Sequence, residues 1–282
     1  PVPVLPVVLG GDDMTVICEG ERAVLFAAAY LRAFEAQTDN GLKDGLGGLL
    51  PKLQGQKFAA AAGVAIVKPH FPFHQAYALA EQLTRSAKAP KDKVKAAPCS
   101  ALDFHVLFDS SGADLADIRG RMTTRDGRAR LTMRPYVVTP VNNLPSDAGG
   151  AWARRRLYSA DHETGYPTLI GATKAMLFRS DERAGDEHSL PRSQAHALQE
   201  AAYESIGLAD GLLRQIAHRY DGFKWSDIAV GQRDAQSLFV DDDGERAPYL
   251  LDALELTDLA GKALAITSVD RSSDPMSAEA YK

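Results

Sequence analysis

The chain has 282 residues, of which 45% are apolar and 24% are charged, a composition typical of a folded protein with a sizeable hydrophobic core. Its net charge of -5 argues against a generally cationic surface of the kind that binds a nucleic acid or a membrane. The longest apolar run, Phe58 to Val67, is about half the roughly 20 residues of a membrane helix, so we expect no membrane partner. Two isolated cysteines, Cys18 and Cys99, provide neither a disulfide framework nor a zinc site, which favours a reducing, cytoplasmic location.

Hydrophobic periodicity divides the first 110 residues into a short series of strands and helices. In chain order we expect a hairpin from Val4 to Cys18, a helix from Glu21 to Ala36, a strand from Phe58 to Val67, a helix from Phe73 to Lys88 and a strand from Ala101 to Phe108. The apolar stripe of the first helix ends at Phe34. This order suits helices packed on one sheet. Such a unit ordinarily opens with a further strand and helix, which we expect before Pro1, because the chain lacks an initiator Met.

The remainder of the chain has a different pattern. Turn residues dominate from residue 109 to 150, except for an extended stretch from Leu131 to Thr139 that predicts an extension of the sheet. Beyond Trp152 the apolar spacing is mostly helical, with predicted helices from Leu190 to Ile206 and from Leu208 to Tyr220, and a polar tail after Asp270. We therefore divide the chain into a first domain over residues 1–110, a sheet extension and linker over 111–150, and a mostly helical module over 151–282.

The tip of the predicted hairpin, Gly10-Gly11-Asp12-Asp13, is the feature that best suits chemistry. Glycines allow a phosphate or a base to approach the backbone, because no Cβ intervenes. Two adjacent carboxylates offer the hard oxygen ligands that Mg²⁺ uses beside nucleotide phosphates. Two ions bound in this way stabilise an attacking 3′-oxygen and a leaving pyrophosphate. The same four residues are also typical of an ordinary tight turn, whose exposed acids have no further role.

The motifs around this turn, in their order and spacing, resemble those of one family. After the turn come a helix, the strand and bend from Ala62 to Pro72, a helix ending in Ala80 to Lys88, the segment from Ser100 to Leu107, and later Arg134 to Val138 and Leu190 to Gln194. This series is similar to the second palm domain of the large subunit of type III CRISPR effector complexes, a cyclase- or polymerase-like domain related to the GGDEF nucleotide cyclases. The resemblance covers the first 110 residues well and the remainder loosely.

The resemblance implies an α+β fold in which helices cover one face of a ferredoxin-like palm sheet. It also implies a metal-dependent nucleotidyltransferase that condenses ATP into cyclic oligoadenylates, with release of pyrophosphate, in an antiviral defence triggered by nucleic acid. Carried over to this chain, Asp12 and Asp13 bind Mg²⁺ or Mn²⁺, Gly10 and Gly11 line the nucleotide, and Lys88 lies near phosphate. A lysine that ends an amphipathic helix equally suits the helix C-terminus, so both roles of Lys88 stay open. The implied partners are RNA, other subunits of a ribonucleoprotein complex and a second palm domain.

Two departures from the family leave other functions open. Related palms take a further metal carboxylate from the first strand of the fold, whereas we expect this chain to start at the second strand. Related palms also work in pairs, whereas this sequence contains one recognisable palm. A non-catalytic scaffold that binds nucleotide, RNA or partner proteins is therefore the alternative. A GGDEF-like cyclase that forms a cyclic dinucleotide from GTP is less favoured, because the turn continues as Gly-Gly-Asp-Asp-Met and lacks the Glu-Phe ending.

A basic segment follows the first domain. Six arginines fall within sixteen positions, with Asp126 as the one acid among them: Arg119, Arg121, Arg125, Arg128, Arg130 and Arg134. Such a cluster contacts an RNA backbone in some proteins, and in others it is a solvated surface whose arginine stems lie over a sheet. The scarcity of aromatic residues among these arginines favours the solvated surface.

Overall fold

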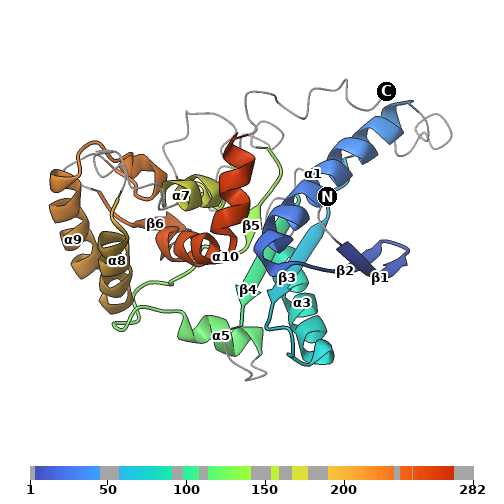
Figure 1. The fold of residues 1–282 in the computed structure, drawn as a ribbon, viewed down its shortest axis with the longest axis horizontal. Helices are drawn as coiled ribbons and strands as arrows, with labels where there is room; N and C mark the ends of the chain where they lie inside the picture. The colour runs from blue at the N-terminus through green and yellow to red at the C-terminus, as the bar shows by residue number, and fades with distance from the viewer. Residues whose placement is uncertain are drawn as a thin grey trace.

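The computed structural model describes residues 4–44, 57–90, 98–107, 114–140, 154–158, 167–176, 190–231, 236–242 and 244–269, which form the fold drawn in Figure 1. Their helices and small sheets confirm the predicted α+β class. The predicted polar tail after Asp270 lies outside the described residues.

The predicted hairpin is present as β1 (Val4–Gly10) and β2 (Asp13–Cys18), which pair antiparallel. Gly10 faces Asp13 across the last pair of the ladder, so Gly11 and Asp12 form the loop between them. Among the described strands, β1 and β2 bond only to each other and make a sheet of their own. The hairpin is thus separate from the larger sheet, whereas the resemblance implied a single palm sheet.

The central sheet has the strand order β3-β4-β5. Strands β3 (Ala61–Ile66) and β4 (Ala101–Val106) run parallel, and helix α3 (Phe73–Ala87) makes the crossover between them. The predicted extension of the sheet is present as β5 (Tyr136–Val137), which pairs antiparallel with β4 but is much shorter than expected. On its other edge, the amide of Val137 donates to the carbonyl O of Arg155 at 2.7 Å.

Helices cover both faces of the central sheet, whereas the resemblance implied helices on one face. Helix α1 (Gly20–Asp44) packs Leu31 into the main buried cluster, and Val64 of β3 packs against the same cluster. Helix α3 packs Leu83 into a second cluster, against which Ala65 of β3 packs. Because consecutive residues of a strand point to opposite faces, α1 and α3 lie on opposite sides of the sheet.

Close packing between β3 and α3 depends on Gly63. A Cβ built on this glycine would lie 2.2 Å from the carbonyl O of Ala80 and 2.4 Å from the amide N of Thr84, both in the backbone of α3. Real Cβ atoms do not approach backbone atoms so closely, so the helix can lie on the strand only where the strand has no side chain.

Helix α1 continues to Asp44, beyond the predicted end at Ala36. The prediction stopped there because the polar residues that follow are typical of a loop. In the structure, the hydroxyl of Thr38 donates to the carbonyl O of Phe34 at 2.7 Å. This bond to the residue four positions earlier satisfies the threonine side chain within the helix, so the polar residue does not end it.

The second half of the chain is mostly helical, as predicted, with one small hairpin. Helix α5 (Leu115–Arg121) lies between β4 and β5. The elements of the second half are α7 (Leu169–Ala175), α8 (Arg192–Glu204), α9 (Ile206–Arg219), the 3-10 helix η4 (Trp225–Asp227), the hairpin of β6 (Phe239–Asp242) and β7 (Glu245–Pro248), and α10 (Leu250–Val269). Helix α10 packs against both α7 and α1 (Figure 1). Its buried residues belong to the same cluster as those of α1, so the core is continuous across the predicted boundary at residue 151.

A buried carboxylate, Asp252 of α10, binds the segment that leads into β5. Its Oδ2 accepts hydrogen bonds from Thr132 Oγ1 at 3.0 Å, from the amide N of Met133 at 2.9 Å and from the hydroxyl of Tyr136 at 2.6 Å. Its Oδ1 lies 3.1 Å from Nη2 of Arg134, and both side chains are almost completely buried. This single side chain therefore fixes α10 against four residues of the preceding half.

Arg134 connects the same carboxylate to the central sheet. Its Nη1 donates to the carbonyl O of Phe104 at 3.0 Å, its guanidinium lies 3.8 Å from the centre of the Phe104 ring, and its Nη2 pairs with Glu255. Burial disfavours the charge of Arg134, but Asp252 and Glu255 outweigh burial and raise its pKa. The guanidinium is thus charged at neutral pH, and it connects the two acids of α10 to Phe104 of β4.

We expect Gly63→Ala to lower the free energy of unfolding by about 1–3 kcal/mol, because the added methyl group has to displace helix backbone rather than a flexible side chain. Urea unfolding measured by circular dichroism checks this. Gly120→Ala in α5 is the control, since a Cβ there has no atom within 4 Å, and it should leave stability unchanged or slightly raised. Equal losses in the two variants would contradict the close packing of α3 on β3.

Asp252→Asn should lower the free energy of unfolding by about 3 kcal/mol or more, because it removes the charge that pairs with a buried guanidinium. Asp258→Asn on the same helix is the matched control. Asp258 pairs with Arg192 at 3.0 Å, but both side chains are exposed, and such pairs contribute about 0–1 kcal/mol. Urea unfolding of both variants measures the difference, and a loss no larger for Asp252→Asn would show that the buried pair has no special role.

Candidate functional site

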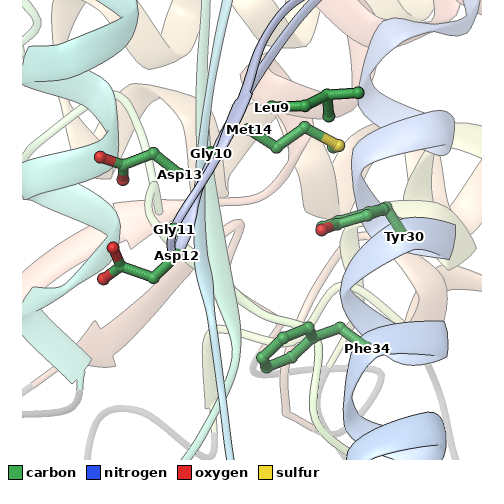
Figure 2. A pocket seen from close by; sticks show the side chains of 8 residues that line it. All are labelled: Leu9, Gly10, Gly11, Asp12, Asp13, Met14, Tyr30 and Phe34. Carbon is green, nitrogen blue, oxygen red and sulfur yellow. The ribbon is translucent and has the colours of Figure 1, made fainter.

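The candidate site is the loop at the tip of the β1–β2 hairpin. Gly11 has a φ of +61°, in the left-handed region where a side chain costs free energy, so the backbone of the loop requires glycine there. Asp12 and Asp13 follow, and both are exposed. In Figure 2 their carboxylates leave the hairpin on the same side, which gives the turn two adjacent oxygen-donor groups on one side.

Gly10 has no comparable backbone reason to be glycine. Its φ is not positive, and a Cβ built on it would have no atom within 4 Å. Neither a turn conformation nor a close neighbour accounts for the missing side chain. The backbone at Gly10 is therefore open to a ligand, which is the property that the sequence predicted for a glycine that lines a nucleotide.

A pocket of about 380 Å³ lies beside this turn. The end of β1, the loop, the start of β2 and one face of α1 form its wall, through Leu9, Gly10, Gly11, Asp12, Asp13, Met14, Tyr30 and Phe34. The pocket is more open than enclosed, so solvent reaches it. Four of the five predicted site residues therefore border one pocket, but the carboxylates of Asp12 and Asp13 point away from it, to the other side of the hairpin (Figure 2).

The sequence interpretation missed the aromatic side of this pocket. Tyr30 and Phe34 are one helical turn apart on α1, and both lie across from the hairpin (Figure 2). The apolar stripe predicted that Phe34 faces the core with Leu31, but Leu31 is buried while Phe34 is half-buried at the pocket. Two aromatic residues spaced i, i+4 on the helix that follows the hairpin are the signal that indicates this wall.

Asp12 and Asp13 are oxygen donors of the kind that suits Mg²⁺ or Mn²⁺. Mg²⁺ is usually bound through one or two carboxylates, with water and substrate phosphates as its other ligands, and the turn matches that donor set. No group of three or more His, Cys, Asp or Glu side chains within the described residues is arranged to bind a metal.

Lys88, the fifth predicted site residue, lies outside the pocket. It is the C-cap residue of α3, its side chain is exposed, and its amide donates to the carbonyl O of Arg85 at 3.2 Å. A cation at this position suits the negative end of the helix dipole, the second of the two roles left open by the sequence. A contact of Lys88 with phosphate stays a prediction.

Most arginines of the basic segment are paired within the chain. The pairs are Arg119 with Asp103 (2.6 Å), Arg125 with Glu204 (2.9 Å), Arg130 with Glu245 (2.8 Å) and Arg134 with Asp252 (3.1 Å). These acids neutralise much of the positive charge of the segment, which weakens its attraction for an RNA backbone. The acids lie in other parts of the chain, so a count of charges within the segment does not show them.

Comparison of the chain with models of protein families and with curated proteins finds no match. Every helix in the described part of the chain is too short or too polar to cross a membrane.

We expect Gly11→Ala to destabilise the hairpin by about 1 kcal/mol, because alanine is strained at a φ of +61°. Hydrogen exchange of the amides that bond β1 to β2 should become faster. Gly10→Ala, one residue earlier, adds the same methyl group in open space and should leave exchange unchanged. Equal acceleration in both variants would contradict this geometry of the turn.

Proposed function

We propose that the chain is the palm of a metal-dependent nucleotidyltransferase that condenses ATP, with release of pyrophosphate, in a nucleic-acid-triggered antiviral defence. The observation that carries the proposal is the Gly-Gly-Asp-Asp turn, which has two exposed carboxylates on one side and open backbone at Gly10. The resemblance of the surrounding motifs to the palm of CRISPR-associated oligoadenylate synthases supports ATP as the substrate.

Each residue of the turn has a separate role in this proposal. Asp12 and Asp13 bind Mg²⁺ or Mn²⁺, and the bound ion neutralises phosphate charge during transfer. Gly10 admits the phosphates to the backbone, because a side chain would occupy that space. Gly11 allows the tight loop that keeps the two carboxylates next to each other.

The exposure of the turn supports the proposal that a partner covers it in the active complex. Both carboxylates face solvent, whereas electrostatic stabilisation of phosphoryl transfer is stronger in a site that excludes water. A second palm domain, in a complex with RNA and other subunits, would provide that cover.

Cys18 and Cys99 are both free thiols, which is compatible with a cytoplasmic complex.

A non-catalytic scaffold is the second candidate. The observation that favours it is the lack of a third acidic ligand beside Asp12 and Asp13 in the part of the chain that the structure describes. A palm of this kind binds ATP with the metal ion but does not convert it, and its assembly with partners does not depend on the two aspartates.

Incubation of the protein with ATP and Mn²⁺, with and without RNA, tests the proposal. We expect oligoadenylates and pyrophosphate from the wild-type protein, and a loss on the order of 100-fold in Asp12→Asn/Asp13→Asn, because the charged metal ligands are removed. Asp117→Asn, which changes an exposed acid on α5, is the matched control and should retain full activity.

Each outcome of this experiment separates two of the candidates. Equal product from the wild type and the double variant would refute the role of the two aspartates. Binding of ATP without any release of pyrophosphate identifies the scaffold. Replacement of ATP by GTP tests a cyclic dinucleotide cyclase, which would convert GTP in preference to ATP.

A further inference from the structure

We infer that the aromatic face of α1, formed by Tyr30 and Phe34, binds the base of a purine nucleoside triphosphate by stacking. The inference rests on the proposed function, because it takes the phosphates of the same nucleotide to be bound at Asp12 and Asp13. It assigns a binding role to two residues that lie outside the turn.

Tyr30 and Phe34 differ from the core residues of α1. Leu31 is 1% exposed and packs in the main cluster, whereas Tyr30 is 38% exposed. Both aromatic side chains line the pocket beside the turn (Figure 2). Accessible aromatic side chains on a concave surface offer a flat, rigid apolar area to a ligand.

The hairpin has different chemistry on its two sides. The apolar side chains of the pocket, with Tyr30 and Phe34, are on the side that faces α1, while the carboxylates of Asp12 and Asp13 extend from the other side (Figure 2). The two glycines lie between these sides and have no side chain. A ligand with a flat apolar end and an anionic, metal-binding end fits this arrangement, with its middle across the glycines.

A nucleoside triphosphate has these two ends. Its base has a π-face that stacks on an aromatic side chain, and its phosphates are ligands for a divalent cation. A purine covers more of an aromatic ring than a pyrimidine does, so a wall of two rings favours a purine. The two aspartates repel free phosphate, so binding of the phosphates requires the metal ion.

Binding of ATP, CTP and inorganic tripolyphosphate, each with Mn²⁺, tests the inference in the wild type, Tyr30→Ala and Phe34→Ala. We expect either substitution to weaken ATP binding about 5- to 100-fold, the usual effect of removing a stacking partner. CTP should bind the wild type more weakly than ATP does, and tripolyphosphate should bind all three proteins equally. Tyr30→Phe retains the ring and should retain the affinity for ATP.

Tyr77→Ala is the matched control. Tyr77, on α3, is also 38% exposed and also lies one helical turn from another aromatic residue, Phe73, with 6.2 Å between the ring centres. It does not line the pocket. Its substitution should leave ATP binding unchanged, and a loss equal to that of Tyr30→Ala would overturn the inference.

The remaining outcomes separate the inference from the proposed function. Unchanged ATP affinity in Tyr30→Ala and Phe34→Ala, or equal losses for ATP and tripolyphosphate, would overturn stacking at this face. If Asp12→Asn/Asp13→Asn still loses tripolyphosphate binding in that case, the metal and phosphate site stands and only the base site is refuted. Unchanged binding of both ligands to Asp12→Asn/Asp13→Asn would refute the proposed function itself.

Discussion

The buried pair of Asp252 and Arg134 determines how the two halves of the molecule fit together. The carboxylate accepts three hydrogen bonds from residues 132–136, and the guanidinium bonds to the carbonyl O of Phe104 in the central sheet. Removal of either partner leaves an unpaired charge in the core, so any other placement of α10 against the sheet is costly. Because α10 also packs against α7, the same pair helps to place α7.

The candidate site lies on a part of the molecule that this pair does not constrain directly. Strands β1 and β2 have no other strand partner in the described part of the chain, and most of β1 is exposed. Helix α1 connects the hairpin to the core, because one of its faces packs with the central sheet and another forms the wall of the pocket. The position of α1 therefore decides which side chains a ligand at the turn would meet.

The sequence predicted those parts of the site that depend on neighbouring residues. The two glycines and two aspartates form a turn because of local backbone preferences, and the structure has that turn at the predicted place. The sequence did not predict the partners of the arginines, since Arg125 pairs with an acid 79 positions away. Nor did it predict the wall at Phe34, because helical spacing alone does not distinguish a face that meets the core from one that meets a hairpin.

By itself, the sequence determined the α+β class, the order of the elements from the hairpin to β4 and the four residues of the turn. These follow from hydrophobic periodicity and turn chemistry, which act over a few residues. Only the tertiary structure decided that α1 and α3 cover opposite faces of the sheet, that the hairpin forms a sheet of its own, and that Tyr30 and Phe34 complete the pocket. Those outcomes depend on which distant segments bury surface against one another, and that free energy is a property of the whole packed arrangement.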